Sequence, residues 1–132
     1  MEIKDSKFYR DKCYINGEWV NADSGETISV NNPANLKEIG TVPKCGTSET
    51  RNAIEAANNA WPEWRAKSAR QRSEILRKWF DLMIENKEEL AQIMTVEQGK
   101  PINESRGEIG YGASFVESVS YTHLTLPTTK NV

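Results

Sequence analysis

The spacing of apolar residues changes at Thr47, and this change constrains the fold of the 132-residue chain more than any other feature. Before Thr47, short apolar runs separated by turn-forming residues predict β-strands. After Thr47, apolar residues recur about every 3.6 positions, which predicts amphipathic helices. We therefore expect an α+β segment with two N-terminal β-hairpins followed by about four helices.

The first 43 residues are expected to form the two hairpins. Asn16-Gly17 separates two short apolar runs, and this dipeptide favours the positive φ angles of a type I′ turn. Residues 27–30 and 38–42 form the second predicted strand pair, joined by a turn that starts at Asn32-Pro33. Residues 1–12 have no apolar pattern, so we expect a loose arm there.

The first two helices are expected over residues 48–60 and 69–85. Pro62 should end or kink the first, because proline lacks a backbone N–H. Trp61 and Trp64 should anchor the chain against a core. Ser68 and Gln71 form a capping-box pattern that opens the second. The second helix carries a wide apolar stripe made of Ile75, Leu76, Trp79, Phe80, Met83 and Ile84.

Two further helices are expected over residues 87–97 and 101–117. Gly99 suits the left-handed residue that ends the first of them. Gly107, Gly110 and Gly112 lie inside the second, where each costs about 1 kcal/mol relative to alanine. They follow the order GxxGxG without a preceding strand, so close helix packing is favoured over a phosphate-binding loop.

Composition and charge exclude several classes of function. The chain has 17 Lys and Arg residues interspersed with 19 Asp and Glu residues and a net charge of -2, which gives no basic surface for nucleic acid. No apolar run approaches the ~20 residues of a membrane span, and the N-terminus lacks a signal-peptide core. We expect a soluble, cytoplasmic protein that binds neither nucleic acid nor membrane.

Few residues are suited to catalysis. Cys13 and Cys45 are too few for a disulfide framework and lack the spacing of metal ligands, so we expect two separate packed or surface thiols. The single histidine is His123. It lies in a run, VSYTHLTLPT at 119–128, that matches one reading frame of a common sequencing-library transposon adapter. We therefore interpret residues 118–132 as a non-native tail, the alternative being a native edge strand.

The order of several sequence phrases resembles the N-terminal part of the aldehyde dehydrogenase superfamily. These phrases are INGEW at 15–19, NPAN at 32–35, IGTVP at 39–43, AIEAANNAWPEWRAKSARQRSEILRKWFDLM at 53–83, ENKEELAQIMTVEQGKP at 85–101 and ESRGEIGYGASFVE at 104–117. The EQGKP and GEIGYGASFVE phrases look most like NAD(P)-dependent succinate-semialdehyde dehydrogenase, the bacterial 4-aminobutyrate-degrading type. Glutarate semialdehyde or another small aldehyde stays open as the substrate.

The resemblance implies an α/β enzyme with a Rossmann-like cofactor domain, a catalytic domain and a dimeric or tetrameric assembly. Residues 1–117 would form an incomplete N-terminal flank of the cofactor-binding domain. In such an enzyme a cysteine thiolate attacks the aldehyde, NAD or NADP accepts hydride, and a glutamate-activated water hydrolyses the thioester. The resemblance assigns no catalytic and no cofactor-binding residue to this chain, so the segment alone is expected to be inactive.

Two minor roles are implied by the same resemblance. Some relatives bind a structural monovalent cation, which would involve Asn31 or the Val30 carbonyl together with Glu97, although Glu97 suits a helix-end hydrogen bond equally well. Tyr111 and Phe115 are candidate walls of a substrate channel, with core packing as the favoured alternative. A non-catalytic helical interaction module remains the alternative from a different functional class.

Overall fold

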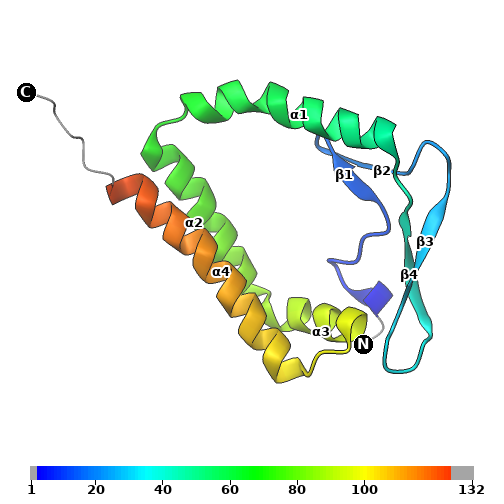
Figure 1. The fold of residues 1–132 in the computed structure, drawn as a ribbon. Coiled ribbons are helices and arrows are strands. Elements are labelled where there is room, and N and C mark those ends of the chain that lie inside the picture. The colour runs from blue at the N-terminus through cyan, green and yellow to red at the C-terminus, as the bar shows by residue number, and fades with distance from the viewer. Residues whose placement is uncertain (1–2, 126–132) are drawn as a thin grey trace, which may run out of the picture.

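The computed structural model describes residues 3–125 and has the expected α+β architecture. Two antiparallel hairpins precede four α-helices, which confirms the predicted order. In Figure 1, α1, the α2–α4 pair and the β3–β4 hairpin form three sides of an open frame. The elements are the 3₁₀ turn η1 (Ile3–Asp5), β1 (Cys13–Ile15), β2 (Glu18–Val20), β3 (Thr27–Asn31), β4 (Glu38–Pro43), α1 (Thr47–Ala66), α2 (Ala69–Glu85), α3 (Lys87–Gln98) and α4 (Ile102–Thr125).

Both hairpins form as predicted. β1 pairs with β2 so that Ile15 lies opposite Glu18, and the turn between them has φ angles of 51° at Asn16 and 84° at Gly17. These positive angles are those that a type I′ turn requires. β3 pairs with β4 over a longer ladder, with an irregularity between Val30 and Asn31. The connection between them turns at Asn32-Pro33, as expected.

The first helix differs from the prediction, because α1 continues through Pro62 to Ala66. Proline removes one hydrogen bond from a helix interior but its fixed φ is helical, and the surrounding turn of α1 is exposed, so water can bind the carbonyl left without a partner. Trp61 is also 53% exposed, so the predicted anchoring against a core is wrong for the described chain. Trp64 is half-buried.

The second helix begins as the sequence predicts. The Ser68 hydroxyl accepts from the Gln71 backbone N–H at 3.3 Å, and the Gln71 side chain accepts from the Ser68 N–H at 2.8 Å. These two bonds satisfy backbone donors at the start of α2 that no helical carbonyl can reach. Ser68 is therefore the N-cap of α2.

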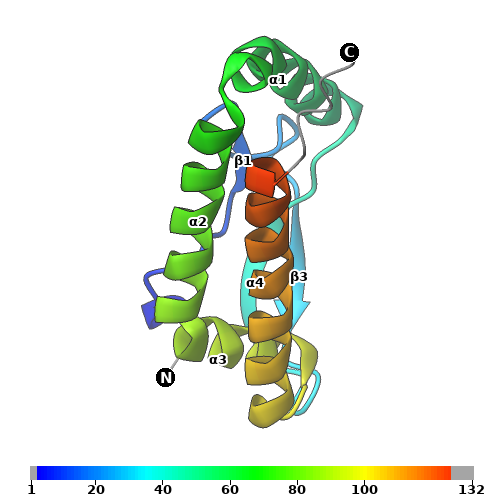
Figure 2. The ribbon, with the colours of Figure 1, turned by 90° about the vertical axis from the view of Figure 1, so that its left-hand side faces the viewer.

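Helices α2 and α4 lie side by side and antiparallel, and α3 closes the bundle at one end (Figure 2). Gly99 ends α3 in the left-handed conformation, with φ 71°, and α4 follows after Pro101, as expected. Arg106 of α4 donates two hydrogen bonds to the Glu88 carboxylate of α3, each 2.7 Å long. Arg77 of α2 contacts Glu117 of α4 at 2.8 Å. Charged side chains therefore tie α4 to both other helices.

From residue 3 onward, the N-terminal arm is not loose. Ile3 is buried in η1, and the Ser6 hydroxyl donates to the Glu89 carboxylate of α3 at 2.6 Å. The backbone N–H of Lys7 donates to the same oxygen at 3.1 Å. Apolar periodicity did not reveal this attachment because one isoleucine and polar contacts make it.

The described residues form a thin core. Within residues 3–121, the buried apolar side chains are Ile3, Ala22, Pro43, Ala91 and Ala113. The predicted stripe on α2 is only half covered: Leu76, Phe80 and Met83 are half-buried, whereas Ile75, Trp79 and Ile84 are exposed. Apolar faces of this extent are typical of surfaces that contact another protein surface.

The last helix extends beyond the predicted residues 101–117 and reaches Thr125. It therefore crosses Ser118, the predicted start of the non-native tail, without a break. The alternative of an edge strand is wrong for residues 119–125, while residues 126–132 lie outside the described part of the chain. In residues 3–125 we find no helix that is both long and apolar enough to cross a membrane.

Candidate functional site

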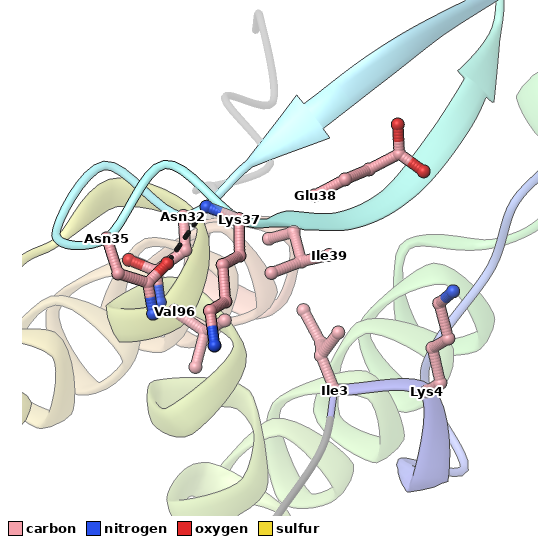
Figure 3. A pocket seen from close by; sticks show the side chains of 8 residues that line it. All are labelled: Ile3, Lys4, Asn32, Asn35, Lys37, Glu38, Ile39 and Val96. Atoms are coloured by element: carbon pink, nitrogen blue, oxygen red, sulfur yellow. Dashed lines mark hydrogen bonds between the residues drawn. The ribbon is translucent and has the colours of Figure 1, made fainter.

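A cavity of about 300 Å³ opens between η1, the β3–β4 connection and α3 (Figure 3). Its lining residues are Ile3, Lys4, Asn32, Asn35, Lys37, Glu38, Ile39 and Val96. The two isoleucines face each other across it, and the Lys37 side chain extends toward Val96. Residues more than 90 positions apart in the sequence thus meet at this point.

The polar groups of this cavity are already used by the local fold. Asn32 accepts from the Ala34 N–H at 2.9 Å, and Asn35 accepts from the Lys37 N–H at 3.0 Å. The Glu38 carboxylate accepts from the Ser29 hydroxyl at 2.6 Å on the strand surface. The cavity also presents the ammonium groups of Lys4 and Lys37, and among its lining residues no nucleophile lies beside a base, the pairing on which covalent catalysis depends.

The residues predicted to bind a cation are brought close together only in part. Val30 and Glu97 line a second, smaller cavity of about 20 Å³, roughly the space of one water molecule. Asn31 does not line it and instead pairs with Glu38 at the end of the β3–β4 ladder. Arg10 also lines the cavity, and its guanidinium donates to the carbonyl oxygens of Lys7 and Tyr9.

The residues predicted to line a channel lie on the open side of α4. Tyr111 is 66% exposed and Phe115 is 54% exposed, and their rings contact edge to face with centroids 4.7 Å apart. Within the described residues neither ring is packed into a core.

The glycine-rich part of α4 also differs from the prediction of close packing. A Cβ placed on Gly107 or Gly112 would meet no atom within 4 Å, whereas one on Gly110 would lie 3.3 Å from Lys87 Nζ. Because these glycines sit inside a helix, their backbone N–H groups are not arranged to hold a phosphate.

The sequence did not predict that the two cysteines would meet. The Cys45 thiol lies 3.5 Å from the Cys13 sulfur and donates a hydrogen bond to it. This hydrogen bond, burial and the negative charges of Glu49 and Asp23 raise the pKa of Cys45. The cysteines lie 32 positions apart on different elements, and no local motif signals such a contact.

One carboxylate near the cysteines is almost completely buried, but its role is structural. Glu49 is 6% exposed and accepts from the Asp23 N–H at 2.6 Å and the Gly46 N–H at 2.9 Å. The N–H of Asp23, together with other backbone donors at the start of α1, lowers the pKa of Glu49. Each carboxylate oxygen accepts a backbone hydrogen bond, and the lowered pKa makes Glu49 a weak base, which does not suit proton abstraction.

A sequence profile of the aldehyde dehydrogenase family matches residues 19–129. The chain belongs to the aldehyde dehydrogenase family. Over 117 residues this aldehyde dehydrogenase segment is 60% identical to a glutarate-semialdehyde dehydrogenase of Pseudomonas putida. It is 55% identical over the same length to an NADP⁺-dependent succinate-semialdehyde dehydrogenase of Escherichia coli. Both alignments cover 89% of this chain and 24% of the relative.

Solved structures of the family agree with the fold of the segment. A succinate-semialdehyde dehydrogenase from Burkholderia pseudomallei superposes with a TM-score of 0.87 and 49% identity, over 96% of this chain and 27% of the other. An aldehyde dehydrogenase from Brucella melitensis superposes with a TM-score of 0.90 and 43% identity, over 99% of this chain and 28% of the other. The segment therefore spans about a quarter of the length of its relatives.

Proposed function

We propose that this segment belongs to a longer NAD(P)-dependent dehydrogenase that oxidises succinate semialdehyde to succinate through a cysteine thioester. The observation that carries the proposal is the 117-residue alignment with enzymes that act on semialdehydes of dicarboxylic acids. The proposal includes a cytoplasmic, dimeric or tetrameric enzyme that uses NAD or NADP. Size-exclusion chromatography of the intact protein tests the assembly.

Glutarate semialdehyde is the second candidate substrate. Relatives named for that substrate, from Pseudomonas putida and Pseudomonas aeruginosa, are 60% and 58% identical to the segment, against 55% for the succinate-semialdehyde enzyme of Escherichia coli. The two substrates differ by one methylene, which a pocket discriminates by only about 10- to 200-fold. A single enzyme can therefore be expected to turn over both at different rates.

We propose that the segment itself supplies the N-terminal flank of the cofactor-binding domain, and that residues 118–132 are a non-native tail. Support comes from the apolar faces of α1 and α2, which include Ile54, Ile75 and Trp79 and remain exposed. A free-standing helical interaction module, the alternative, would require these 132 residues to fold without a larger core. The family membership of the segment favours the flank.

The test of the main proposal uses the intact protein and follows the absorbance of reduced nicotinamide. We expect turnover of succinate semialdehyde and glutarate semialdehyde, and at least about tenfold lower kcat/KM for butanal, an aldehyde of similar size that lacks the terminal carboxylate. The 132-residue chain alone should give no reduced cofactor. Equal activity on butanal would contradict the substrate class, and turnover by the 132-residue chain would contradict the assignment of a flank.

We further propose that Tyr111 and Phe115 form part of the substrate channel. Their support is the exposed ring pair on α4. Tyr111→Ala and Phe115→Ala in the intact enzyme should raise KM for the semialdehyde with little change in kcat. Tyr14→Ala removes a similarly exposed aromatic from the first hairpin and is the matched control. Equal effects at all three positions would contradict a channel.

The structural cation is proposed to involve Glu97 with Asn31 or the Val30 carbonyl, and the small cavity between Val30 and Glu97 supports it. Replacing sodium and potassium by tetramethylammonium should lower the melting temperature of the intact protein. Glu97→Gln should abolish this difference, whereas Glu104→Gln, an exposed glutamate of α4, should preserve it. A cation-independent melting temperature in the parent protein would contradict the site.

A further inference from the structure

Cys13 and Cys45 form a thiol pair that the dehydrogenase chemistry does not use. Cys13 begins β1, and Cys45 lies in the short connection between β4 and α1. Their sulfur atoms are 3.5 Å apart, and both residues are half-buried. Two half-buried thiols in direct contact, supplied by separate elements, form a site at which a specific covalent bond can be made.

We propose that Cys13 and Cys45 form a reversible disulfide, so that this part of the protein is a thiol–disulfide modification site. A disulfide bond is about 2.05 Å long, so the sulfurs must approach by roughly 1.5 Å. The structure allows this approach because Cys45 lies in the connection between β4, which ends at Pro43, and the first turn of α1. A metal site is not supported, because the residues described include no group of three or more potential His, Cys, Asp or Glu ligands.

The proposed oxidant is a small-molecule disulfide such as oxidised glutathione. One cysteine thiolate attacks a sulfur of the oxidant, which forms a protein–glutathione mixed disulfide and releases one glutathione thiolate. The second cysteine thiolate then attacks the protein sulfur of that mixed disulfide and expels the second glutathione. The protein loses two electrons and two protons, and the oxidant accepts both as two molecules of reduced glutathione.

The surroundings of the pair slow its oxidation. The hydrogen bond to Cys13 and partial burial raise the pKa of Cys45, and the carboxylates of Glu49 and Asp23 act in the same direction. Because the thiolate is the nucleophile, a raised pKa slows the reaction at Cys45. The pair should therefore respond to sustained oxidation rather than to a brief encounter.

Disulfide formation would also change the mechanics of this region. The bond would join the first strand directly to the start of α1 and enclose both hairpins in one covalent loop. Glu49 already fastens this helix end to the loop before β3 through the Asp23 N–H. A covalent link beside that hydrogen bond would restrict opening of the hairpins away from α1.

The test uses the intact protein in glutathione buffers of graded redox ratio, both native and in urea. After alkylation of the remaining thiols, trypsin should release residues 13–37 linked to residues 45–51, because lysines or arginines end each peptide. We compare the ratio of oxidised to reduced glutathione at which half of the protein carries the disulfide. This ratio should be about tenfold lower or more in native buffer than in urea, because the native fold holds the two sulfurs in contact.

Single variants provide the controls. Cys13→Ser and Cys45→Ser should each give only a mixed disulfide with glutathione and never the linked peptides. Equal midpoints of disulfide formation in native buffer and in urea would overturn the proposal. It would also be overturned if the parent protein formed only mixed disulfides with glutathione and no linked peptides. The peptide readout needs no dehydrogenase activity, so failure of the semialdehyde assay would leave this proposal standing.

Discussion

Replacing Gly99 by alanine tests whether the α3–α4 junction is fastened to the β3–β4 connection. Gly99 has φ 71°, a left-handed conformation that costs an alanine about 1–2 kcal/mol. The added Cβ would also lie 2.8 Å from Cγ of Pro33, well inside the usual carbon–carbon separation of about 3.5–4.0 Å. Relieving that overlap costs roughly 1–3 kcal/mol more. We therefore expect a total destabilisation of about 2–5 kcal/mol at this junction.

Hydrogen exchange of the intact protein, read by mass spectrometry of peptides, measures this effect locally. The Gly99 N–H donates to the Thr95 carbonyl at 2.9 Å, so it reports directly on the end of α3. Because about 1.4 kcal/mol corresponds to a tenfold change in an equilibrium constant, amides at this junction should exchange about 30-fold faster or more. Peptides that contain Pro33 should show the same change, since the ring has to move.

Gly25→Ala is the matched control, because Gly25 also has φ 71° but no atom lies within 4 Å of the position of its Cβ. Gly25→Ala should cost only the about 1–2 kcal/mol of the left-handed conformation, and faster hydrogen exchange should be confined to the turn that contains Gly25. The difference between the two variants isolates the contact with Pro33. If Gly99→Ala accelerates hydrogen exchange no more than Gly25→Ala does, close packing of Gly99 against Pro33 does not hold the α3–α4 junction in place.

Three other predictions follow from single features of the fold. Ser68→Ala should cost about 1 kcal/mol and speed exchange in the first turn of α2 roughly fivefold, an effect that the exposed Ser114→Ala in α4 should lack. Backbone donors lower the pKa of Glu49 below 4.5, so its ionised form stabilises the fold above that pH and loses this contribution as pH falls through the lowered pKa. The melting temperature of Glu49→Gln should therefore decrease less on acidification than that of the parent. The isolated 132-residue chain should bind a hydrophobic dye and unfold without a cooperative transition, because so few of its apolar side chains are buried; a sharp two-state transition would contradict this expectation.

The sequence predicted most of what is decided by local chemistry. Asn16-Gly17 specified its turn and Ser68 its cap because turns and caps depend on a few neighbouring residues. Of the two outcomes expected at Pro62, an end or a kink of the first helix, the end does not occur, because whether proline ends a helix depends on surroundings that the sequence does not show. The N-terminal arm was also misread, since its attachment rests on the long-range contact between Ser6 and Glu89.

The candidate site was less predictable than the fold, for the same reason. Val30 and Glu97 were proposed from the resemblance, and the fold does bring them to one cavity, but Asn31 lies outside it. The contact between Cys13 and Cys45 had no signal in the sequence at all. Contacts between residues tens of positions apart are set by how elements pack, which no spacing of residue types specifies.

The contacts that organise this segment are mainly polar, and this bears on how it is stabilised. Arg106 with Glu88, Arg77 with Glu117 and Ser6 with Glu89 fix the positions of the helices and the N-terminal arm. Such exposed or part-exposed pairs contribute little free energy each, about 0–1 kcal/mol. Burial of apolar area supplies most of the stability of a domain, and here the large apolar side chains are exposed on α1, α2 and α4. The polar contacts thus fix the geometry of the segment, and the proposed flank of a cofactor-binding domain would gain most of its stability when these exposed apolar faces are covered.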